Sequence, residues 1–441
     1  MGKHVVVIGA GYTGLVAALR LAQAGNKVTI LERGDTVGGL ASDFKVEGAS
    51  LERAYHHLFK TDRDIIEMTE ELGIADSLQW HDSSVALYYD NVLYPFKGAL
   101  DLIRFKPLSF INRIRAGLVV VYLQRTNNWH QFEKVTAYDW MLKAGGKQVT
   151  KVIWEPLLRG KFDRYFDKVS MAWLWARIHV RAQSREAGGE KLGYFEGGFQ
   201  TFTNALVEKL QSLGVVIETG AEIASVDSTA PGKVKISFTD KTNRTYDACV
   251  ATTPSHVFAR LVEKSSAAKP AYIKQLNSIN YLGARLLIFS SDQEISPYYW
   301  HNVNDQELPF LVFIHHTKLI DKQNYNGKFI YYIATYVPHE HELFTCDDAE
   351  LEKLWFDGLT TIFPDFDSTQ IHEKHFFRFA NAQHIVSTNY GEGIPSLKTP
   401  LANVYLSNFS QIYPEDRGTN YAVREGKKVA KLVQDISLKE K

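Results

Sequence analysis

A strand and a glycine-rich turn near the N-terminus decide the fold of this chain: Val5-Val6-Val7-Ile8-Gly9-Ala10-Gly11-Tyr12-Thr13-Gly14. Its first four residues form an apolar, β-branched run, which is typical of a parallel strand buried on both faces. Leucines and alanines then recur at helical spacing over 15–21, and a second apolar run at 28–31 ends at Glu32. The order strand, turn, helix, strand predicts a Rossmann-like α/β unit.

The three glycines of this turn have separate tasks in binding a dinucleotide. Gly9 permits the turn, Gly11 lets a pyrophosphate approach the backbone, and Gly14 lets the helix and the strand pack closely. The helix N-terminus offers N–H groups and a partial positive charge to the phosphates. Glu32 lies where an acidic residue accepts hydrogen bonds from ribose hydroxyls, and it disfavours a 2′-phosphorylated nucleotide. The sequence therefore predicts dinucleotide contacts from Gly9, Ala10, Gly11, Tyr12, Thr13, Gly14, Glu32 and Arg33.

Four later segments carry further motifs. They are the Gly-Gly loop at 38–39, the run Gly193 to Val226 with Gly197-Gly198, the run Ala248 to Pro254, and the segment 403–426. Together they resemble FAD-dependent oxidoreductases of the amine oxidase, protoporphyrinogen oxidase and phytoene desaturase superfamily. The resemblance covers the whole chain and implies FAD as the cofactor. It also implies further cofactor contacts at Gly38, Gly39, Leu40, Glu222, Ile223, Asn408, Thr419, Asn420 and Tyr421.

The resemblance implies two domains with a cleft between them. The cofactor motifs recur in three blocks, so we expect a discontinuous FAD-binding domain of residues 1–80, 195–270 and 385–441. The remaining blocks, 81–194 and 271–384, are expected to form an α+β substrate-binding domain. The first is rich in helix-like patterns, and the second contains strand-like runs at 286–289, 310–314 and 329–334.

The C-terminal flavin segment departs from the family at one point. Where the family has Gly-Asp, this chain has Ser407-Asn408. The amide of Asn408 can still donate and accept hydrogen bonds, but it supplies no negative charge.

Composition excludes several classes of function. Lys and Arg number 50 and Asp and Glu number 50, so the net charge is zero and a nucleic-acid-binding surface is not expected. Two cysteines, Cys249 and Cys346, fit a reducing compartment and leave no cysteine-rich metal site. The chain enters its first strand almost at once and has no long apolar run, so we predict a cytoplasmic location, with no leader, membrane span or metal.

Two adjacent histidines, His56 and His57, are the candidate catalytic residues. They follow the Gly-Gly loop, and in the superfamily this region passes close to the flavin. His57 and Phe59 also resemble an H-x-F stretch that lies beside the flavin in UDP-galactopyranose mutases. The alternative interpretation is a pair of structural histidines bonded to the backbone.

A basic, aromatic region predicts the substrate site. It runs over 154–162 and 173–181, where one helix face carries Trp173, Arg177 and Arg181 at i, i+4 spacing. Arginine forks suit phosphate or carboxylate, and a neighbouring aromatic ring suits a sugar or nucleobase. The candidate substrate contacts are Arg159, Lys161, Trp173, Arg177 and Arg181. The alternative is a structural helix whose arginines form ion pairs.

The segment 102–115 mixes bulky apolar and basic residues. It is consistent with a helix on a membrane surface that admits a lipid-linked substrate, or with an ordinary helix of the substrate domain. The zero net charge of the chain favours the second interpretation. The sequence predicts no oligomeric state.

Two functions follow from the resemblance. The first is an FAD-dependent oxidoreductase that transfers a hydride from a substrate C–H to flavin N5. Its small-molecule substrate is expected to be anionic, either a nucleotide-sugar or lipid-like. The second is a redox-neutral sugar mutase or isomerase that resembles UDP-galactopyranose mutase. Amine oxidation is disfavoured because the lysine of amine-oxidising members falls on Ala284, next to Arg285.

Overall fold

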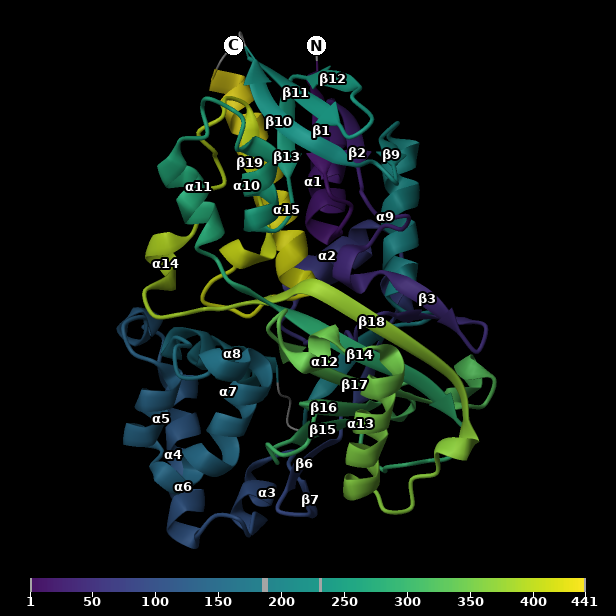
Figure 1. Ribbon diagram of the computed structural model, residues 1–441, viewed down its shortest axis with the longest axis vertical. Coiled ribbons are helices and arrows are strands. Elements are labelled where there is room, and N and C mark those ends of the chain that lie inside the picture. Colours follow the sequence, from purple (N-terminus) through teal and green to yellow (C-terminus); the bar gives the residue numbers. More distant parts are fainter. Residues whose placement is uncertain (1, 185–188, 230–231, 440–441) are drawn as a thin grey trace.

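A five-stranded parallel sheet forms one half of the molecule (Figure 1). The structure is a computed structural model that describes residues 2–184, 189–229 and 232–439. The strand order is β19-β13-β1-β2-β9, and every neighbouring pair is parallel. In sheet order the strands are β19 (Val404–Leu406), β13 (Ala248–Ala251), β1 (His4–Ile8), β2 (Lys27–Leu31) and β9 (Val216–Glu218). Segments far apart in the sequence thus meet in one sheet, with β1 at its centre.

Alternate residues of β1 pack into two different cores. Val5 and Val7 face a cluster formed with the helices α1, α2, α9 and α15, whereas Val6 and Ile8 face α10, α11 and a three-stranded antiparallel sheet. Burial on both faces accounts for the continuous apolar run at this strand. The bounds are α1 (Tyr12–Gln23), α2 (Arg63–Glu71), α9 (Phe199–Ser212), α15 (Thr419–Lys439), α10 (Ser255–Val262), α11 (Pro270–Asn277), β10 (Ile223–Thr229), β11 (Lys233–Phe238) and β12 (Asn243–Tyr246).

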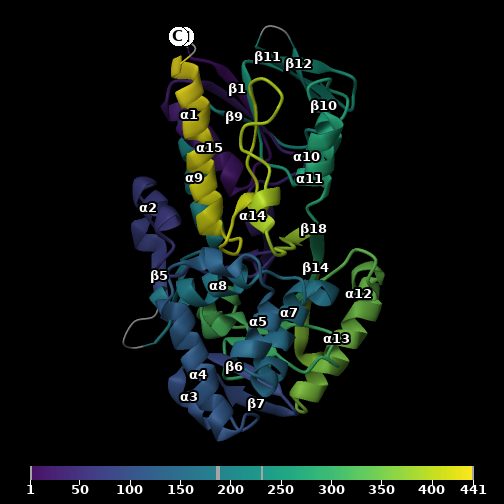
Figure 2. The same ribbon diagram turned by 90° about the vertical axis from the view of Figure 1, so that its left-hand side faces the viewer.

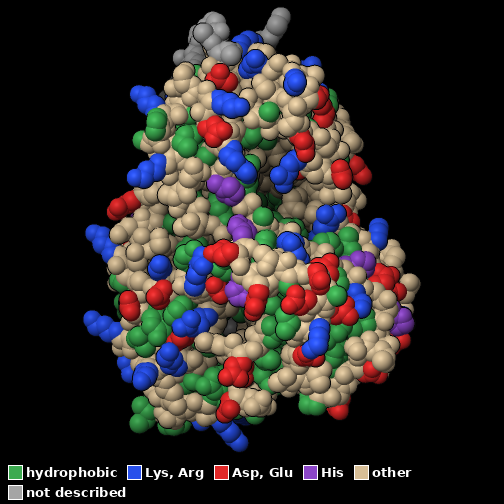
Figure 3. Space-filling view, viewed as in Figure 1, with side chains coloured by type: hydrophobic (Ala, Val, Ile, Leu, Met, Phe, Trp, Pro, Cys, Tyr) green, Lys and Arg blue, Asp and Glu red, His purple; other side chains and the backbone are tan. Residues whose placement is uncertain are grey.

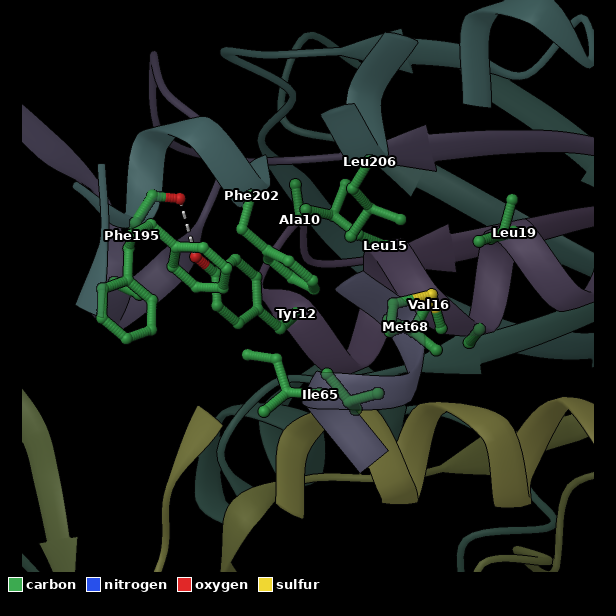
Figure 4. Packing of buried hydrophobic residues seen from close by; sticks show 14 of the residues in the cluster. Ala10, Tyr12, Leu15, Val16, Leu19, Ile65, Met68, Phe195, Phe202 and Leu206 are labelled. Atoms are coloured by element: carbon green, nitrogen blue, oxygen red, sulfur yellow. Dashed lines mark hydrogen bonds between the residues drawn. The ribbon is translucent and has the colours of Figure 1, made fainter. Parts of the chain in front are cut away.

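The first of these cores fixes the glycine-rich turn in place. Figure 4 shows Tyr12 and Leu15 of α1 against Phe202 and Leu206 of α9, with α2 packed nearby. The Tyr12 hydroxyl is buried and lies 3.0 Å from the Thr203 hydroxyl. This packing holds the N-terminus of α1 at the carboxyl edge of the parallel sheet.

A seven-stranded mixed sheet forms the other half. Its order is β18-β14-β17-β16-β15-β6-β7, and all neighbours are antiparallel except β15 and β6. The bounds are β18 (Ile371–His384), β14 (Tyr281–Ser291), β17 (Phe329–Val337), β16 (Val312–His315), β15 (Trp300–Val303), β6 (Val85–Tyr89) and β7 (Val92–Pro95). Long β14 and β18 run from this sheet toward the parallel one and join the two halves (Figure 1).

Helices cover this second sheet on two sides (Figure 2). One group shares a core that contains Trp154, Trp173 and Trp175: α3 (Ala99–Arg104), α4 (Phe110–Arg125), α5 (Ala137–Ala144), α6 (Lys147–Val149), a π-helical turn (Thr150–Trp154), α7 (Glu155–Phe162) and α8 (Met171–Ser184). The other side carries α12 (Glu342–Thr345) and α13 (Asp348–Ile362). Besides short 3-10 turns, the structure contains α14 (Tyr390–Gly393) and two antiparallel strand pairs, β3 (Asp43–Val46) with β4 (Ala49–Glu52) and β5 (Leu78–Asp82) with β8 (Lys191–Phe195).

The α/β fold with a Rossmann-like unit and a second domain is confirmed. The strand-like runs expected at 286–289 and 329–334 lie within β14 and β17. The parallel sheet draws its strands from the three blocks of the expected FAD-binding domain, but the exact domain boundaries stay a prediction. Over the residues that the structure describes, no helix has the length and apolarity needed to cross a bilayer.

Candidate functional site

The glycine-rich turn leaves no room for side chains at two positions. A Cβ on Gly14 would lie 1.9 Å from the carbonyl oxygen of Gly9, and Gly9 itself has a φ of +102°. Gly38 and Gly39 of the second glycine loop have positive φ, and the Gly38 N–H donates to Ala10 O at 2.8 Å. The two loops therefore lie against each other and form one backbone-lined cradle.

The N-terminus of α1 opens into this cradle without a side-chain cap. Gly11 is the N-cap, and the first turn contains no acidic residue. Unpaired N–H groups and the helix dipole at such an end favour a diphosphate. The cradle therefore fits the pyrophosphate of a dinucleotide, and the backbone of the 9–14 turn would hold it. The Tyr12 side chain, by contrast, is part of the core.

Glu32 ends β2 and closes one side of the cradle. Its carboxylate accepts hydrogen bonds from the Ala10 N–H at 2.7 Å and the Gly34 N–H at 2.8 Å, while Arg33 beside it is exposed. The Ala221 N–H donates to Glu32 O at 2.8 Å, which brings Glu222 and Ile223 beside the end of β2. These residues form the place where the nucleoside end of a dinucleotide would lie.

At the C-terminal segment, the Asn408 side chain is hydrogen-bonded within the protein. Its amide donates to Thr253 O at 2.8 Å and to Ser255 Oγ at 3.2 Å, and its oxygen accepts from the Ser410 hydroxyl at 2.6 Å. The side chain thus joins the 408–410 turn to the 253–255 segment, and its expected cofactor contact stays a prediction. Thr419, Asn420 and Tyr421, at the start of α15, do line the cavity described next.

A cavity of about 220 Å³ lies where the two halves meet. Its walls come from the 54–62 segment, the loop before α15, the inner face of α8, and the face of the seven-stranded sheet that carries Ala284 and Tyr336. Leu40 from the second glycine loop also lines it, so the cavity continues the dinucleotide cradle. Figure 3 shows the molecular surface hollowed between the two halves. A flavin ring and a substrate would meet in this cavity.

Both candidate histidines line the cavity as neutral side chains. Burial lowers the pKa of His56 to about 4 and that of His57 to about 3. His56 Nδ1 lies 2.6 Å from Ala54 O; because a carbonyl only accepts, Nδ1 carries the proton and Nε2 keeps a lone pair. His57 Nδ1 lies 3.2 Å from the Tyr299 hydroxyl. His56 is therefore able to accept a proton from a ligand.

A cluster of cations surrounds one carboxylate in the same cavity. Asp416 accepts hydrogen bonds from Lys161 Nζ and, at 3.0 Å, from Arg177 Nη1. Burial alone would raise the pKa of Asp416, but Lys161, Arg177 and Arg417 outweigh it and hold that pKa well below its usual range. Burial lowers the pKa of Lys161 to about 8 against the opposing effect of Asp416, so this lysine stays mostly protonated near neutral pH.

Two tyrosines complete the cluster. Arg417 Nη2 donates to the Tyr336 hydroxyl at 3.0 Å, and that hydroxyl lies 3.3 Å from the Tyr55 hydroxyl. Burial acts to raise the pKa of Tyr336, but Arg417 and Lys161 overcome it and lower that pKa, whereas burial raises the pKa of Tyr55. The cluster carries three cations against one ionised carboxylate, so this wall of the cavity is positively charged.

The remaining substrate candidates divide into two groups. Arg181 lines the cavity and lies 3.8 Å from Glu190, within reach of a ligand. Arg159 lies outside the cavity, because its guanidinium binds Glu155 at 2.8 Å and stacks on Phe166. Trp173 is fully buried, and its ring packs behind Lys161 and Arg177. It supports these cations and does not offer the stacking face that the sequence suggested.

A family model described as flavin containing amine oxidoreductase matches residues 12–434. The chain belongs to the flavin-containing amine oxidoreductase family. It is an FAD-dependent oxidoreductase, and the cradle described above fits FAD. It is 23% identical to 15-cis-phytoene desaturase of Solanum lycopersicum over 465 aligned residues, which cover 99% of this chain and 78% of that one.

Two solved structures share the fold of this flavin-containing amine oxidoreductase family member. A putative protoporphyrinogen oxidase from Exiguobacterium sp. 255-15 superposes with a TM-score of 0.78 at 17% identity, covering 100% of this chain and 99% of that chain. Reduced UDP-galactopyranose mutase superposes with a TM-score of 0.78 at 16% identity, covering 99% and 94%. At these identities the likeness shows the fold alone.

Sequence reasoning missed the residues of this family member's cavity that come from loops and strand faces. Asp416 and Arg417 lie in the loop before α15, and Tyr336 lies on β17. The adjacent acid and base just before Gly418 were the only local signal for the first two. Tyr55, beside the predicted histidines, gave no signal of its own. Ala284 lines the cavity whereas Arg285 points away and binds Asp348 at 2.8 Å, so this strand brings no lysine to the site.

Proposed function

We propose that this FAD-dependent oxidoreductase removes a hydride from a C–H bond of an anionic substrate, either a nucleotide-sugar or a lipid-like carboxylate or phosphate. The observation that carries the proposal is the excess of cations over carboxylates at the cavity wall, formed by Lys161, Arg177, Arg417 and Asp416. When bound, FAD supplies the hydride acceptor.

The cation cluster supports an anionic substrate on energetic grounds. Buried charges are stable only when they are paired and hydrogen-bonded. Arg417 Nε has no hydrogen-bond partner among the described residues, and Lys161 and Arg177 share one carboxylate. A phosphate or carboxylate group accepts several such hydrogen bonds at once. Its binding would relieve the charge excess and orient the substrate in the cavity.

His56 is the proposed proton acceptor. Its Nε2 lone pair is free for a ligand because Nδ1 is held by Ala54 O, and its low pKa keeps the ring neutral above about pH 5. His57 is proposed to orient the substrate beside it, with its ring held in place by an edge-to-face contact with Phe59. The walls formed by Leu286, Val312 and Phe379 would exclude water from the reacting atoms.

The test has two steps on the holoenzyme. The flavin is first released by heat and identified, and the protein is then mixed anaerobically with a nucleotide-sugar (UDP-galactose), an unsaturated fatty acid (oleate) and a primary amine (putrescine). We expect an anionic compound to bleach the oxidised flavin. Bleaching by the amine alone would contradict the proposal.

A matched pair of variants locates the anion site. We expect Arg177→Met to raise the apparent dissociation constant of the reducing substrate at least about tenfold, because one charged hydrogen bond is lost. The oxidised flavin spectrum should stay unchanged. Arg159→Met, on the neighbouring helix but outside the cavity, should leave the constant as it is. Equal effects of both variants would assign the cations a structural role.

A redox-neutral sugar mutase is the second candidate. It is favoured by the placement of both His57 and Phe59, the H-x-F pair, on the wall of the cavity that also holds the cations. The discriminating experiment reduces the flavin with dithionite before a nucleotide-sugar is added. Isomerised sugar with the flavin still reduced would support the mutase, whereas product that forms only with oxidised flavin supports the oxidoreductase.

A further inference from the structure

Large apolar side chains are exposed together on α3 and α4. Among the residues that the structure describes, eight of the twelve exposed large hydrophobic residues lie between positions 100 and 122. Ile111 is 79% exposed, Leu100 67% and Leu118 65%. We call the set the α3–α4 surface: Leu100, Ile103, Phe110, Ile111, Ile114, Leu118, Val121 and Tyr122. Scattered exposed leucines are ordinary, but such a concentration marks a binding surface.

Helix α4 is apolar on its outer face as well as on its inner face. Ala116, Val119 and Leu123 are buried against the protein. Phe110, Ile114, Leu118 and Tyr122 recur every fourth residue on the exposed side. Phe110, Ile114 and Leu118 of this outer stripe belong to none of the hydrophobic cores of the described residues, whereas an ordinary surface helix turns polar residues to water there. Tyr122 stacks on Trp140, and such aromatic pairs suit the level of lipid headgroups.

The charge of this region is strongly positive although the whole chain has zero net charge. Residues 92–125 contain six Lys and Arg and a single acid, Asp101. Lys97, Arg104, Lys106, Arg115 and Arg125 are exposed around the apolar stripe. In the lower left of Figure 3, where α4 lies in Figure 1, hydrophobic and basic side chains occur side by side. An apolar stripe with a basic rim complements an anionic lipid surface.

The α3–α4 surface also lies beside a second cavity that adjoins the site. A second cavity, of about 210 Å³, is lined by Val120 and Gln124 of α4 and by Phe96 and Lys97 just before α3. It shares Leu157, Arg177, Arg181 and Asn302 with the first cavity. Helix α4 and the residues just before α3 thus form one wall of the cavity next to the cations, and the exposed stripe lies on the same two helices. Both lie at the end of the molecule opposite the two termini (Figures 1 and 2).

We propose that the α3–α4 surface binds the headgroup region of an anionic lipid bilayer, with the outer stripe of α4 inserted and the basic residues at the phosphates. This binding is interfacial, and it is independent of the proposed reaction. The proposal reverses the sequence expectation, which favoured an ordinary helix of the substrate domain because the chain has zero net charge. The positive charge of residues 92–125 and the exposed apolar side chains are stronger evidence than the net charge of the whole chain. A substrate held in the bilayer would then face the second cavity.

The test is flotation of the purified holoenzyme with vesicles of phosphatidylcholine containing 30% phosphatidylglycerol. We expect the protein to float with these vesicles, and to float much less with pure phosphatidylcholine or in 0.5 M NaCl, since screening weakens the phosphate contacts. The double variant Ile111→Glu/Leu118→Glu should lower the bound fraction about tenfold or more, because two inserted apolar side chains are lost.

The matched control is Leu354→Glu, an exposed leucine on α13 away from the α3–α4 surface. It should float like the unaltered protein, and all variants should keep their FAD and their melting temperature. Failure of the unaltered protein to float would overturn the proposal, as would an equal loss in Leu354→Glu. The proposal would also be overturned if light scattering showed the unaltered protein to be a dimer and the double variant a monomer. A second copy of the chain would then cover the α3–α4 surface. None of these outcomes depends on finding the enzyme's substrate.

Discussion

Asp416 is the residue on which the charge balance of the cavity depends. Lys161 and Arg177 both bind its carboxylate, and its side chain is only 15% exposed. Removing one partner of a buried ion pair leaves the other charges uncompensated. We expect Asp416→Asn to lower the free energy of unfolding by about 3 kcal/mol, measured by urea denaturation of the apoprotein. It should also lower the pKa of Lys161 further, because the carboxylate that raises it is gone.

The control for this prediction is an ion pair that water already screens. Glu340 binds Arg164, and both side chains are more than half exposed, so Glu340→Gln should leave the urea midpoint unchanged. Phosphate at millimolar concentration should partly restore the free energy of unfolding of Asp416→Gln or Asp416→Asn. A phosphate anion can take the place of the lost carboxylate between the remaining cations. If Asp416→Asn had the same urea midpoint as the unaltered protein, the cations of the cluster would not need the Asp416 carboxylate for stability.

At the scale of one element, successive side chains of β14 point alternately into the cavity and to the opposite face of the sheet. Ala284 points into the cavity and pairs with Tyr336 of β17, whereas Arg285 points to the other face of the sheet. We expect Ala284→Leu to weaken FAD binding or shift the flavin absorbance, with about a tenfold rise in the FAD dissociation constant, because the larger side chain enters the cavity. Reconstitution of the apoprotein with FAD measures it.

Arg285→Met tests the same strand on its opposite face. It removes the hydrogen bond to Asp348 and should lower the melting temperature, but the FAD dissociation constant and the flavin spectrum should not change. If Arg285→Met changed the FAD dissociation constant and Ala284→Leu did not, the cofactor would lie on the Arg285 face of the sheet, which would contradict the prediction.

At the scale of the whole molecule, local sequence order decided what was predictable. The strand, the three glycines and Glu32 lie within 28 residues, and the short distance along the chain lets physical rules place them. The cation cluster has no such order, because α7 and α8, β17, and the loop before α15 bring its members together from three parts of the chain that are far apart in sequence. The prediction that Trp173 offers a stacking face to the substrate has a related limit. Helical spacing shows which residues share a face of α8, but it does not show which part of that face other elements cover.

Buried histidines give the molecule a predictable acid sensitivity. Burial lowers the pKa of six histidines to about 3 or 4: His56, His57, His301, His315, His316 and His384. Between about pH 4 and 6.5 the unfolded chain binds protons at these side chains and the folded protein does not, so their contribution to stability is lost as the pH falls. Burial also raises the pKa of Glu52 and of Asp62 to about 7, and these two carboxyls act in the opposite direction.

Because the six histidines outnumber the two carboxyls, the unfolded chain binds more protons overall, and each net proton costs roughly 1.4 kcal/mol per pH unit. We therefore expect the melting temperature to fall by about 10 °C or more between pH 7 and pH 5, followed by intrinsic fluorescence at constant ionic strength. His316→Gln, which removes a fully buried ring bound to the Tyr325 hydroxyl, should flatten this slope even if it lowers the melting temperature at pH 7. A melting temperature that stays constant or rises toward pH 5 would mean that the buried carboxyls, and not the histidines, dominate the proton balance of the fold.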